Sequence, residues 1–140
     1  RTEKNMARFL PILTAGRYKD AKIDPDSYTI RVYDSRAQTY KDKKIFSGGT
    51  KDQVSLALRL SFAMATLPQE RGTAPDFLFL DEPVGSFDDE RQEALVELLT
   101  RGEIAETFNQ IFVVSHVGEL KEEFSRYIKM EDGQIVDKAL

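Results

Sequence analysis

The sequence predicts an α/β protein in which helices flank parallel strands and a β-hairpin ends the chain. Two short apolar runs, 76–81 and 110–115, have the length and composition of buried strands. Helical segments precede and follow these runs, and the order helix, strand, helix, strand, helix is typical of α/β layers. With 140 residues, the chain fits one domain with its own hydrophobic core.

The composition is that of a soluble globular domain and excludes several kinds of site. Apolar residues make up 41% of the chain and charged residues 31%. No apolar run approaches the roughly 20 residues that span a bilayer, and no signal-peptide core follows residues 1–5. The absence of cysteine removes disulfides and thiolate metal sites, and the net charge of -4 argues against strong nucleic-acid binding by this segment alone. We expect a cytoplasmic or nuclear protein with no membrane contact.

The first third of the chain predicts a helix followed by a hairpin. Residues 3–13 place four apolar side chains on one helical face, namely Met6, Phe9, Leu10 and Leu13. We interpret residues 1–15 as the end of a helix that enters from upstream, with Gly16 as its stop. Runs 21–23 and 28–33 flank a turn and predict two antiparallel strands. The stretch 40–44 is short and polar and is interpreted as a connection.

The remaining elements follow from changes in apolar pattern. Residues 46–67 predict a long buried helix after a Ser-Gly-Gly start, and 69–75 predict a loop. The first parallel strand then leads into a helix over 88–100, whose first turn is acidic. The second strand leads into a short helix over 117–124. A final hairpin turns at Asp132-Gly133.

Two adjacent carboxylates, Asp81 and Glu82, follow the first predicted strand. Ligand sites of parallel α/β sheets lie beyond the carboxyl ends of the strands. Asp81 is therefore placed to hold Mg²⁺, which is commonly bound by one or two carboxylates plus phosphate oxygens. Glu82 could orient and deprotonate a water for attack on a γ-phosphate. Taken alone, Asp-Glu-Pro is also a plain acidic exit from a strand.

The glycine pair after Ser47 opens the long helix, where backbone amides and the helix dipole favour an anion. Gly48 and Gly49 would let a phosphate approach closely, and Lys51 would add positive charge. A plain turn and cap explains the same residues. Arg59 stands among leucines, so it is either buried with a partner or extends its charged end to solvent.

His116, the only histidine, follows the second predicted strand and would lie beside Asp81 and Glu82. It could bond a γ-phosphate or position the attacking water, although a lone histidine is also often structural. Asp88 precedes the acidic helix and would cap it, which by itself explains the residue.

Four motifs in this order resemble those of the ABC ATPases. Residues 46–49 (Phe-Ser-Gly-Gly) are similar to the signature motif, 77–83 to the Walker B strand with its base, 85–88 (Gly-Ser-Phe-Asp) to the D-loop, and His116 to the switch histidine. The chain departs from the family at Phe46 and Phe87, where leucine is usual, and at Thr50, where Glu or Gln is common. The resemblance implies a P-loop NTPase-like head of which residues 1–140 form the carboxy-terminal lobe.

The resemblance also implies the cofactors ATP and Mg²⁺ and a role for each motif residue. Glu82 and His116 would be catalytic, Asp81 the metal ligand, and Arg59 a coupling residue on the signature helix. The nucleotide-binding residues would be Ser47, Gly48, Gly49, Lys51 and Asp88. No G-x-x-x-x-G-K-[ST] occurs in the 140 residues, so ATP hydrolysis is expected only with an amino-terminal phosphate-loop lobe. The resemblance implies that Asp81, Glu82 and His116 serve the ATP of their own head, while Ser47, Gly48, Gly49 and Asp88 reach the ATP of a second head. Residues 46–67 would hold the signature motif and its helix, and 76–140 the Walker B, D-loop and switch-histidine region.

The spacing of the motifs resembles the SMC and SbcC type of ATPase, which acts in chromosome maintenance and double-strand-break repair. That branch implies a homodimer of heads, DNA, and a nuclease or accessory subunit as partners, with coiled coils moved by ATP. Two alternatives remain. A transporter subunit would carry a phosphate loop within roughly a hundred residues upstream, and a non-hydrolysing interaction module would lack ATPase activity when both lobes are joined.

Overall fold

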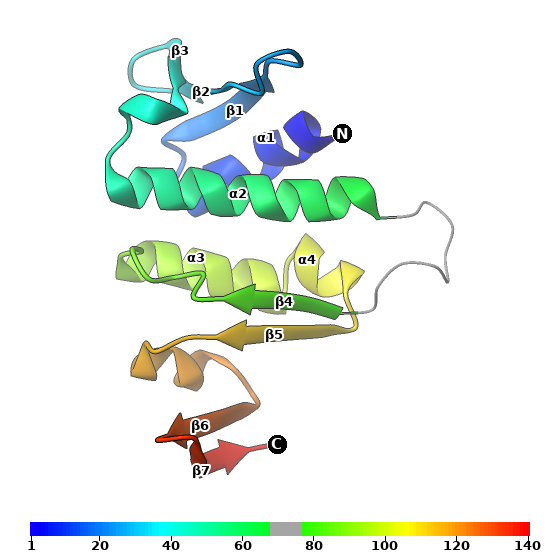
Figure 1. Ribbon diagram of the computed structural model, residues 1–140, viewed down its shortest axis with the longest axis vertical. Helices are drawn as coiled ribbons and strands as arrows, with labels where there is room; N and C mark the ends of the chain where they lie inside the picture. Colours follow the sequence, from blue (N-terminus) through cyan, green and yellow to red (C-terminus); the bar gives the residue numbers. More distant parts are fainter. Residues whose placement is uncertain (68–76) are drawn as a thin grey trace.

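The computed structural model describes residues 1–67 and 77–140 and confirms the predicted α/β class. Helices and strands lie in successive layers along the long axis of the molecule, from the β1–β3 sheet at one end to the β6–β7 hairpin at the other (Figure 1). The loop predicted over 69–75 lies outside the described residues. Within the described ranges, no helix is both long and apolar enough to cross a membrane.

Helix α1 (Thr2–Leu13) has the apolar face that the sequence predicts. Its four buried side chains are Met6, Phe9, Leu10 and Leu13, each at most 1% exposed. The helix ends before Gly16, whose φ of 74° lies in the left-handed region that glycine adopts without strain. The chain can therefore turn directly into the first strand.

A three-stranded antiparallel sheet follows, made of β1 (Tyr18–Ile23), β2 (Ile30–Asp34) and β3 (Thr39–Asp42). The hairpin of β1 and β2 was predicted, whereas interpreting 40–44 as a connection was wrong. Strand β3 pairs in register with β2, and its side chains are only partly buried. An edge strand with few apolar residues shows almost no alternation of apolar and polar residues in the sequence. Pairing with β2 in the folded protein therefore determines that this segment is a strand.

Asp34 ties this sheet to the end of α1. Its carboxylate is fully buried and accepts hydrogen bonds from Arg17 Nε (3.0 Å) and Nη2 (3.1 Å) and from Lys41 Nζ (2.7 Å). The backbone amides of Arg36 and Ala37 also donate to it. These donors, with Arg17 first, hold the pKa of Asp34 well below its ordinary value.

Helix α2 (Gly48–Thr66) follows the short 3-10 turn η1 (Lys43–Ile45) and packs along α1. Val54, Ala57 and Leu60 face the core with at most 1% exposure. Asn5, near the start of α1, donates a hydrogen bond from Nδ2 to the carbonyl of Ser61 (3.1 Å), near the end of α2. This bond ties the two helices together. The predicted helix over 46–67 is thus confirmed, with its first turn beginning two residues later.

The parallel layer consists of β4 (Phe77–Asp81) and β5 (Gln110–Val114), with α3 (Asp89–Thr100) and α4 (Glu103–Thr107) on one side. The parallel pairing was predicted; the short helix α4 was not. The two strands were expected to be buried on both faces, and this is wrong for the described chain. Phe79 is 59% exposed and Phe112 46% exposed, because only the face toward α3 and α4 is covered.

The chain ends with a 3-10 segment and a hairpin. The helix predicted over 117–124 is the 3-10 segment η2 (Gly118–Glu123). Strands β6 (Tyr127–Glu131) and β7 (Gln134–Ala139) form the predicted hairpin around Gly133, whose φ is 76°. Most of their side chains are exposed.

Candidate functional site

The strands β4 and β5 end at the same edge of the molecule and bring the predicted acidic and histidine residues together. Asp81 is the last residue of β4 and pairs with Val114 of β5. The next residue, Glu82, donates its backbone N–H to the carbonyl of Val114 (2.8 Å). This bond holds Glu82 against the end of β5, two residues before His116.

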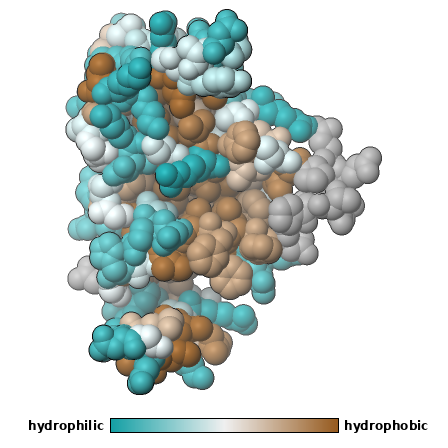
Figure 2. Space-filling view, viewed as in Figure 1, coloured by the Kyte–Doolittle hydropathy of each residue, from teal (hydrophilic) through white to brown (hydrophobic). Residues whose placement is uncertain are grey.

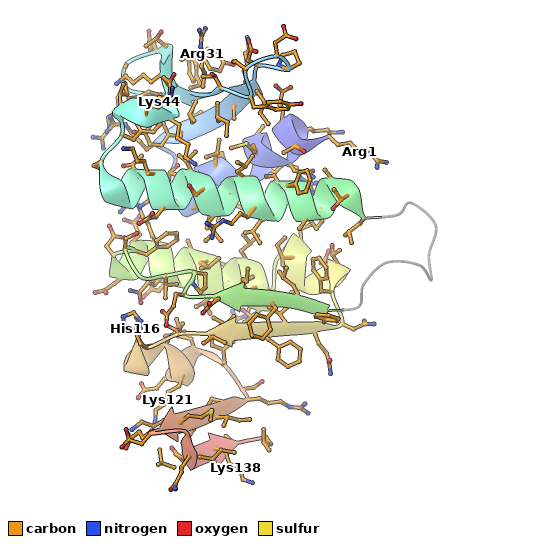
Figure 3. All side chains as sticks on the ribbon, in the orientation of Figure 1. Arg1, Arg31, Lys44, His116, Lys121 and Lys138 are labelled. Atoms are coloured by element: carbon orange, nitrogen blue, oxygen red, sulfur yellow. The ribbon has the colours of Figure 1, made fainter. Side chains whose placement is uncertain are left out.

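Glu82 and His116 are in direct contact. Oε2 of Glu82 lies 2.8 Å from Nδ1 of His116, and the two side chains are 40% and 76% exposed, respectively. Figure 3 shows His116 just beyond the end of β5. The backbone of Glu82 has a φ of 47°, a left-handed conformation that is uncommon outside glycine and that recurs at functional sites. The loop geometry therefore places a carboxylate beside an imidazole at the open edge of the sheet.

Asp81 is exposed at the same edge, and it was predicted to hold the metal. In the described ranges, no group of three or more His, Asp or Glu side chains could hold a metal ion by itself. One aspartate nevertheless fits Mg²⁺, because this ion commonly takes one or two carboxylates and completes its shell with water and phosphate oxygens. The donor set thus fits a metal that arrives with a nucleotide, and does not fit a closed structural metal site.

The segment between Glu82 and α3 is fixed by two buried side chains, Val84 (1% exposed) and Phe87 (7% exposed). Asp88 caps α3 as predicted: its carboxylate accepts from the backbone N–H of Arg91 (3.0 Å) and also contacts the Arg91 guanidinium. Because its side chain is 56% exposed, Asp88 also remains accessible at the surface.

The Ser-Gly-Gly segment lies next to this loop. Ser47 is the extended N-cap residue of α2, and its hydroxyl bonds that of Thr50 (3.3 Å) without capping the helix amides. A Cβ placed on Gly49 would lie 3.5 Å from the carbonyl oxygen of Ser86. Ser47 and Gly48 are exposed, so the first amides of α2 face solvent beside the 82–88 loop.

The two basic residues of α2 are both exposed. Lys51 lies in the first turn, while Arg59 lies twelve positions beyond Ser47, roughly 18 Å along the helix. Arg59 is therefore not buried with a partner; the alternative of a solvated charge is correct. Both charges act on Lys43, whose pKa is lowered first by burial and then by Arg59.

A shallow pocket at the start of α2 was not predicted. We call it the α2 pocket; it measures about 280 Å³ and is lined by Arg17, Tyr18, Ser47, Gly49, Thr50, Gln53 and Arg91. Ser47 and Gly49 were predicted as site residues, but Arg17 and Arg91 come from distant parts of the sequence. Gln53 carried a weak signal, since it is a polar residue on the buried face of an apolar helix. Nothing in the sequence around the two arginines indicated this pocket, because only folding brings them to it.

Comparisons with known proteins identify a family and solved structures of the same fold. The profile of a family described as SbcC/RAD50-like, Walker B motif, matches residues 25–101. The chain is 30% identical over 118 residues to the SbcC component of the nuclease SbcCD from Staphylococcus saprophyticus, and the match covers 81% of this chain and 12% of that relative. The chain therefore spans about an eighth of the length of that protein.

Solved structures share the fold at low sequence identity. One comes from work on ATP-driven dimerization and DNA-stimulated activation of SMC ATPases, with a TM-score of 0.72, 17% identity, and coverage of 99% of this chain and 81% of the other. Another is the Smc head domain of Pyrococcus furiosus bound to the C-terminal domain of ScpA, with a TM-score of 0.66, 16% identity, and coverage of 96% and 33%. These likenesses show the fold.

Proposed function

The chain belongs to the SbcC/RAD50-like Walker B family, and from this premise we propose that it is the carboxy-terminal half of an ATPase head of the SMC and SbcC type. ATP hydrolysis would require an amino-terminal lobe with a phosphate loop. The observation that carries the proposal is the contact between Glu82 and His116 at the carboxyl edge of β4 and β5. A parallel α/β sheet binds ligands at this edge.

In the proposed site, Glu82 is the general base. Its carboxylate would accept a proton from the attacking water, and the 2.8 Å contact with His116 would fix its orientation. His116 would reach the γ-phosphate or the water from the side of β5. Both side chains are partly exposed here, and a lobe packed over this edge would exclude water and strengthen these interactions.

Asp81 would hold Mg²⁺ together with the phosphates of ATP. The ion would neutralise the negative charge that develops on the transferred phosphoryl group. Asp81 supplies the exposed carboxylate for this at the end of β4, one residue from the base. ATP and Mg²⁺ are thus the proposed cofactors.

The second group of residues would serve a nucleotide held by another head. Ser47, Gly48 and Gly49 present the amino end of α2 at the surface, where hydroxyl and amide donors favour phosphate. Lys51 adds exposed positive charge to the first turn. Asp88 lies at the end of the 82–88 loop, which approaches the signature segment where the carbonyl of Ser86 faces Gly49. Farther along α2, Arg59 would couple this binding to the movement of the lobe.

The open face of β4 and β5 supports an amino-terminal lobe as partner. Figure 2 shows apolar surface over the middle of this face, and its exposed side chains include Phe77, Phe79, Phe112 and Val114. The ring centroids of Phe79 and Phe112 lie 6.1 Å apart, so the two exposed rings are neighbours on this face. Exposed contiguous apolar surface of this kind marks an interaction site.

Partners beyond the head follow from the family. DNA and a nuclease subunit are proposed from the similarity to the SbcC component of the nuclease SbcCD, and an accessory protein from the ScpA-bound Smc head. Pairing of heads on ATP and their release on hydrolysis would move coiled coils engaged with DNA. A location in the cytoplasm at the nucleoid, or in a nucleus, would follow from this role.

Replacement of the base tests the proposal. In the full-length protein, Glu82→Gln is expected to lower the ATP turnover number by about 10²–10⁴, because the amide cannot accept the proton. ATP-dependent pairing of heads should persist, as the contacts that bind nucleotide remain. The matched control is Glu93→Gln, the same change on the exposed face of α3, which should turn over ATP at the parent rate. Parent-like turnover by Glu82→Gln would exclude Glu82 as the base.

A further inference from the structure

The turn that follows β5 places His116 on the open side of the sheet. The residues on either side of Val114 are half-buried, whereas Val114 itself and His116 are exposed. Strand β5 ends at Val114, and the chain then passes through His116 into η2 (Figure 1). Because the imidazole is 76% exposed, packing alone does not hold it in one orientation. Its position therefore depends on the hydrogen bonds of the ring and of the turn.

The ring itself is bonded to the candidate base. Nδ1 of His116 lies 2.8 Å from Oε2 of Glu82. A carboxylate that acts as a base is ionised and can only accept hydrogen bonds, so Nδ1 carries the hydrogen of this pair. The second ring nitrogen, Nε2, is then the one left to face a phosphate or a water. A rotation of the turn would break the bond to Glu82 and redirect Nε2 as well.

The main chain of the turn is closed by the hydroxyl of Ser115. Oγ of Ser115 accepts a hydrogen bond from the backbone N–H of Val117 (3.1 Å), so the hydroxyl bridges the two neighbours of His116. No backbone carbonyl of residues 1–67 and 77–140 accepts from that N–H. The carbonyl of Val117 accepts from the backbone N–H of Leu120 (3.2 Å), whose side chain is 7% exposed. The far side of the turn is thus anchored in the core.

The near side of the turn is fixed to the base. The carbonyl of Val114, the residue before Ser115, accepts from the backbone N–H of Glu82 (2.8 Å). Ser115 therefore joins two fixed points, the end of β5 beside Glu82 and the start of η2 at Val117. His116 is the exposed residue between them, and the Ser115 hydroxyl is the side-chain group that closes this segment.

We propose that Ser115 is a positioning residue, which holds the imidazole of His116 against the carboxylate of Glu82. The inference rests on the proposed function, and it adds a residue that acts through His116 without contacting the phosphate itself. Loss of the hydroxyl would leave the N–H of Val117 to water and would free the turn to rotate. Serine and threonine fit this role, because each carries a hydroxyl on Cβ.

The test measures ATP turnover by the full-length protein in a double-mutant cycle. Ser115→Ala is expected to lower the turnover number by about fivefold to tenfold, the size of one lost hydrogen bond. The KM for ATP should change by less than about twofold, because the residues that bind the nucleotide are unchanged. In a His116→Ala background, Ser115→Ala should lower turnover by less than about twofold, since the residue through which it acts is gone. Ser125→Ala, at an exposed serine, is the control and should keep the parent rate.

A matched pair of variants isolates the hydroxyl. Threonine and valine have nearly the same shape, and only threonine can accept the hydrogen bond. Ser115→Thr should turn over ATP within about twofold of the parent, whereas Ser115→Val should lose about as much as Ser115→Ala. Because both side chains are β-branched, this pair decides the question even if Ser115→Ala folds poorly.

Each outcome decides between the proposals. If Ser115→Ala and Ser115→Val turn over ATP at the parent rate while His116→Ala is impaired, the inference fails and the proposed function stands. If Ser115→Ala lowers turnover by the same factor with and without His116, Ser115 supports only the fold, which also overturns the inference. If His116→Ala itself keeps the parent rate, the catalytic role of His116 fails, and the inference fails with it. Loss in Ser115→Val, recovery in Ser115→Thr and no added loss without His116 support the inference.

Discussion

The two halves of the chain use similar apolar residues but cover them to different extents. In the first half, α1, β1–β3 and α2 enclose a core in which Phe9, Leu10 and Leu60 are at most 1% exposed. In the second half, α3 and α4 cover one face of β4 and β5, and Phe79 and Phe112 remain open on the other. The β6–β7 hairpin likewise exposes Ile128, Met130 and Ile135.

This difference supports the proposal that another lobe covers the exposed face of the second half. Burial of apolar area stabilises by about 25 cal/mol per Å², so side chains this exposed contribute little until they are covered. The catalytic candidates Asp81, Glu82 and His116 lie in the open half. The buried ion cluster of Asp34 lies in the closed half. Under the proposed function, the closed half is the scaffold that also presents the start of α2, and the open half is the docking surface that carries the candidate base and metal ligand.

The largest effect on stability is expected from truncation in the closed half. Leu10→Ala should lower the free energy of unfolding by about 4 kcal/mol, because it removes a fully buried side chain between α1 and its neighbours and leaves a cavity. Urea denaturation of the chain measures the change. The control is Ile12→Ala on the same helix, which is 41% exposed and should cost less than about 1 kcal/mol. Equal losses for the two variants would contradict a sealed core in this half.

A somewhat smaller, pH-dependent effect is expected at Asp34. Asp34→Asn should destabilise by about 3 kcal/mol at neutral pH, because Arg17 and Lys41 lose a buried charged partner. The pKa of Asp34 is lowered in the folded state, so its contribution is fully present above the unfolded value of about 3.9 and is lost as pH falls toward the folded value.

Denaturation of parent and Asp34→Asn between neutral and acidic pH checks the sign. The difference in unfolding free energy should be constant above about pH 5 and shrink steadily below it. Tyr40→Phe is a useful comparison, because its hydrogen bond to Asp20 and, after it, burial raise the pKa of Tyr40 to about 12, outside this range. If the difference between parent and Asp34→Asn grew on acidification, the pKa of Asp34 would not be lowered in the folded state.

The smallest effect on stability is expected on the open face. Phe79→Ser should change the free energy of unfolding of the chain by less than about 1 kcal/mol, since its ring is largely in solvent. It should nevertheless weaken association with an amino-terminal lobe, measured by titration calorimetry. Leu80→Ser, one residue on and 9% exposed, should destabilise the chain itself. A large loss of stability for Phe79→Ser would mean that this face is part of the core of the chain.

Particular residues show how much of the fold and of the candidate site could be predicted from the sequence. The spacing of Met6, Phe9, Leu10 and Leu13 predicted α1 and its buried face, because helical periodicity is a local property. The order of strand, acidic pair and histidine placed Glu82 near His116, since parallel strands share an edge. Their assignment to catalysis stays a prediction.

Strand β3 and helix α4 were missed because each is short and its pattern is weak. The exposure of Phe79 was missed for a different reason. An apolar run has the same sequence whether both of its faces are covered within the chain or one of them awaits a partner.

The sequence by itself thus determined the class of fold, the order of most elements and the residues at the strand ends. These features depend on residue spacing over one or two turns of helix or a single strand. Only the tertiary structure decided which face of β4 and β5 is open, and that Arg17, Gln53 and Arg91 meet at the start of α2. The physical reason is that such contacts join segments far apart in the sequence, and packing of whole elements sets them.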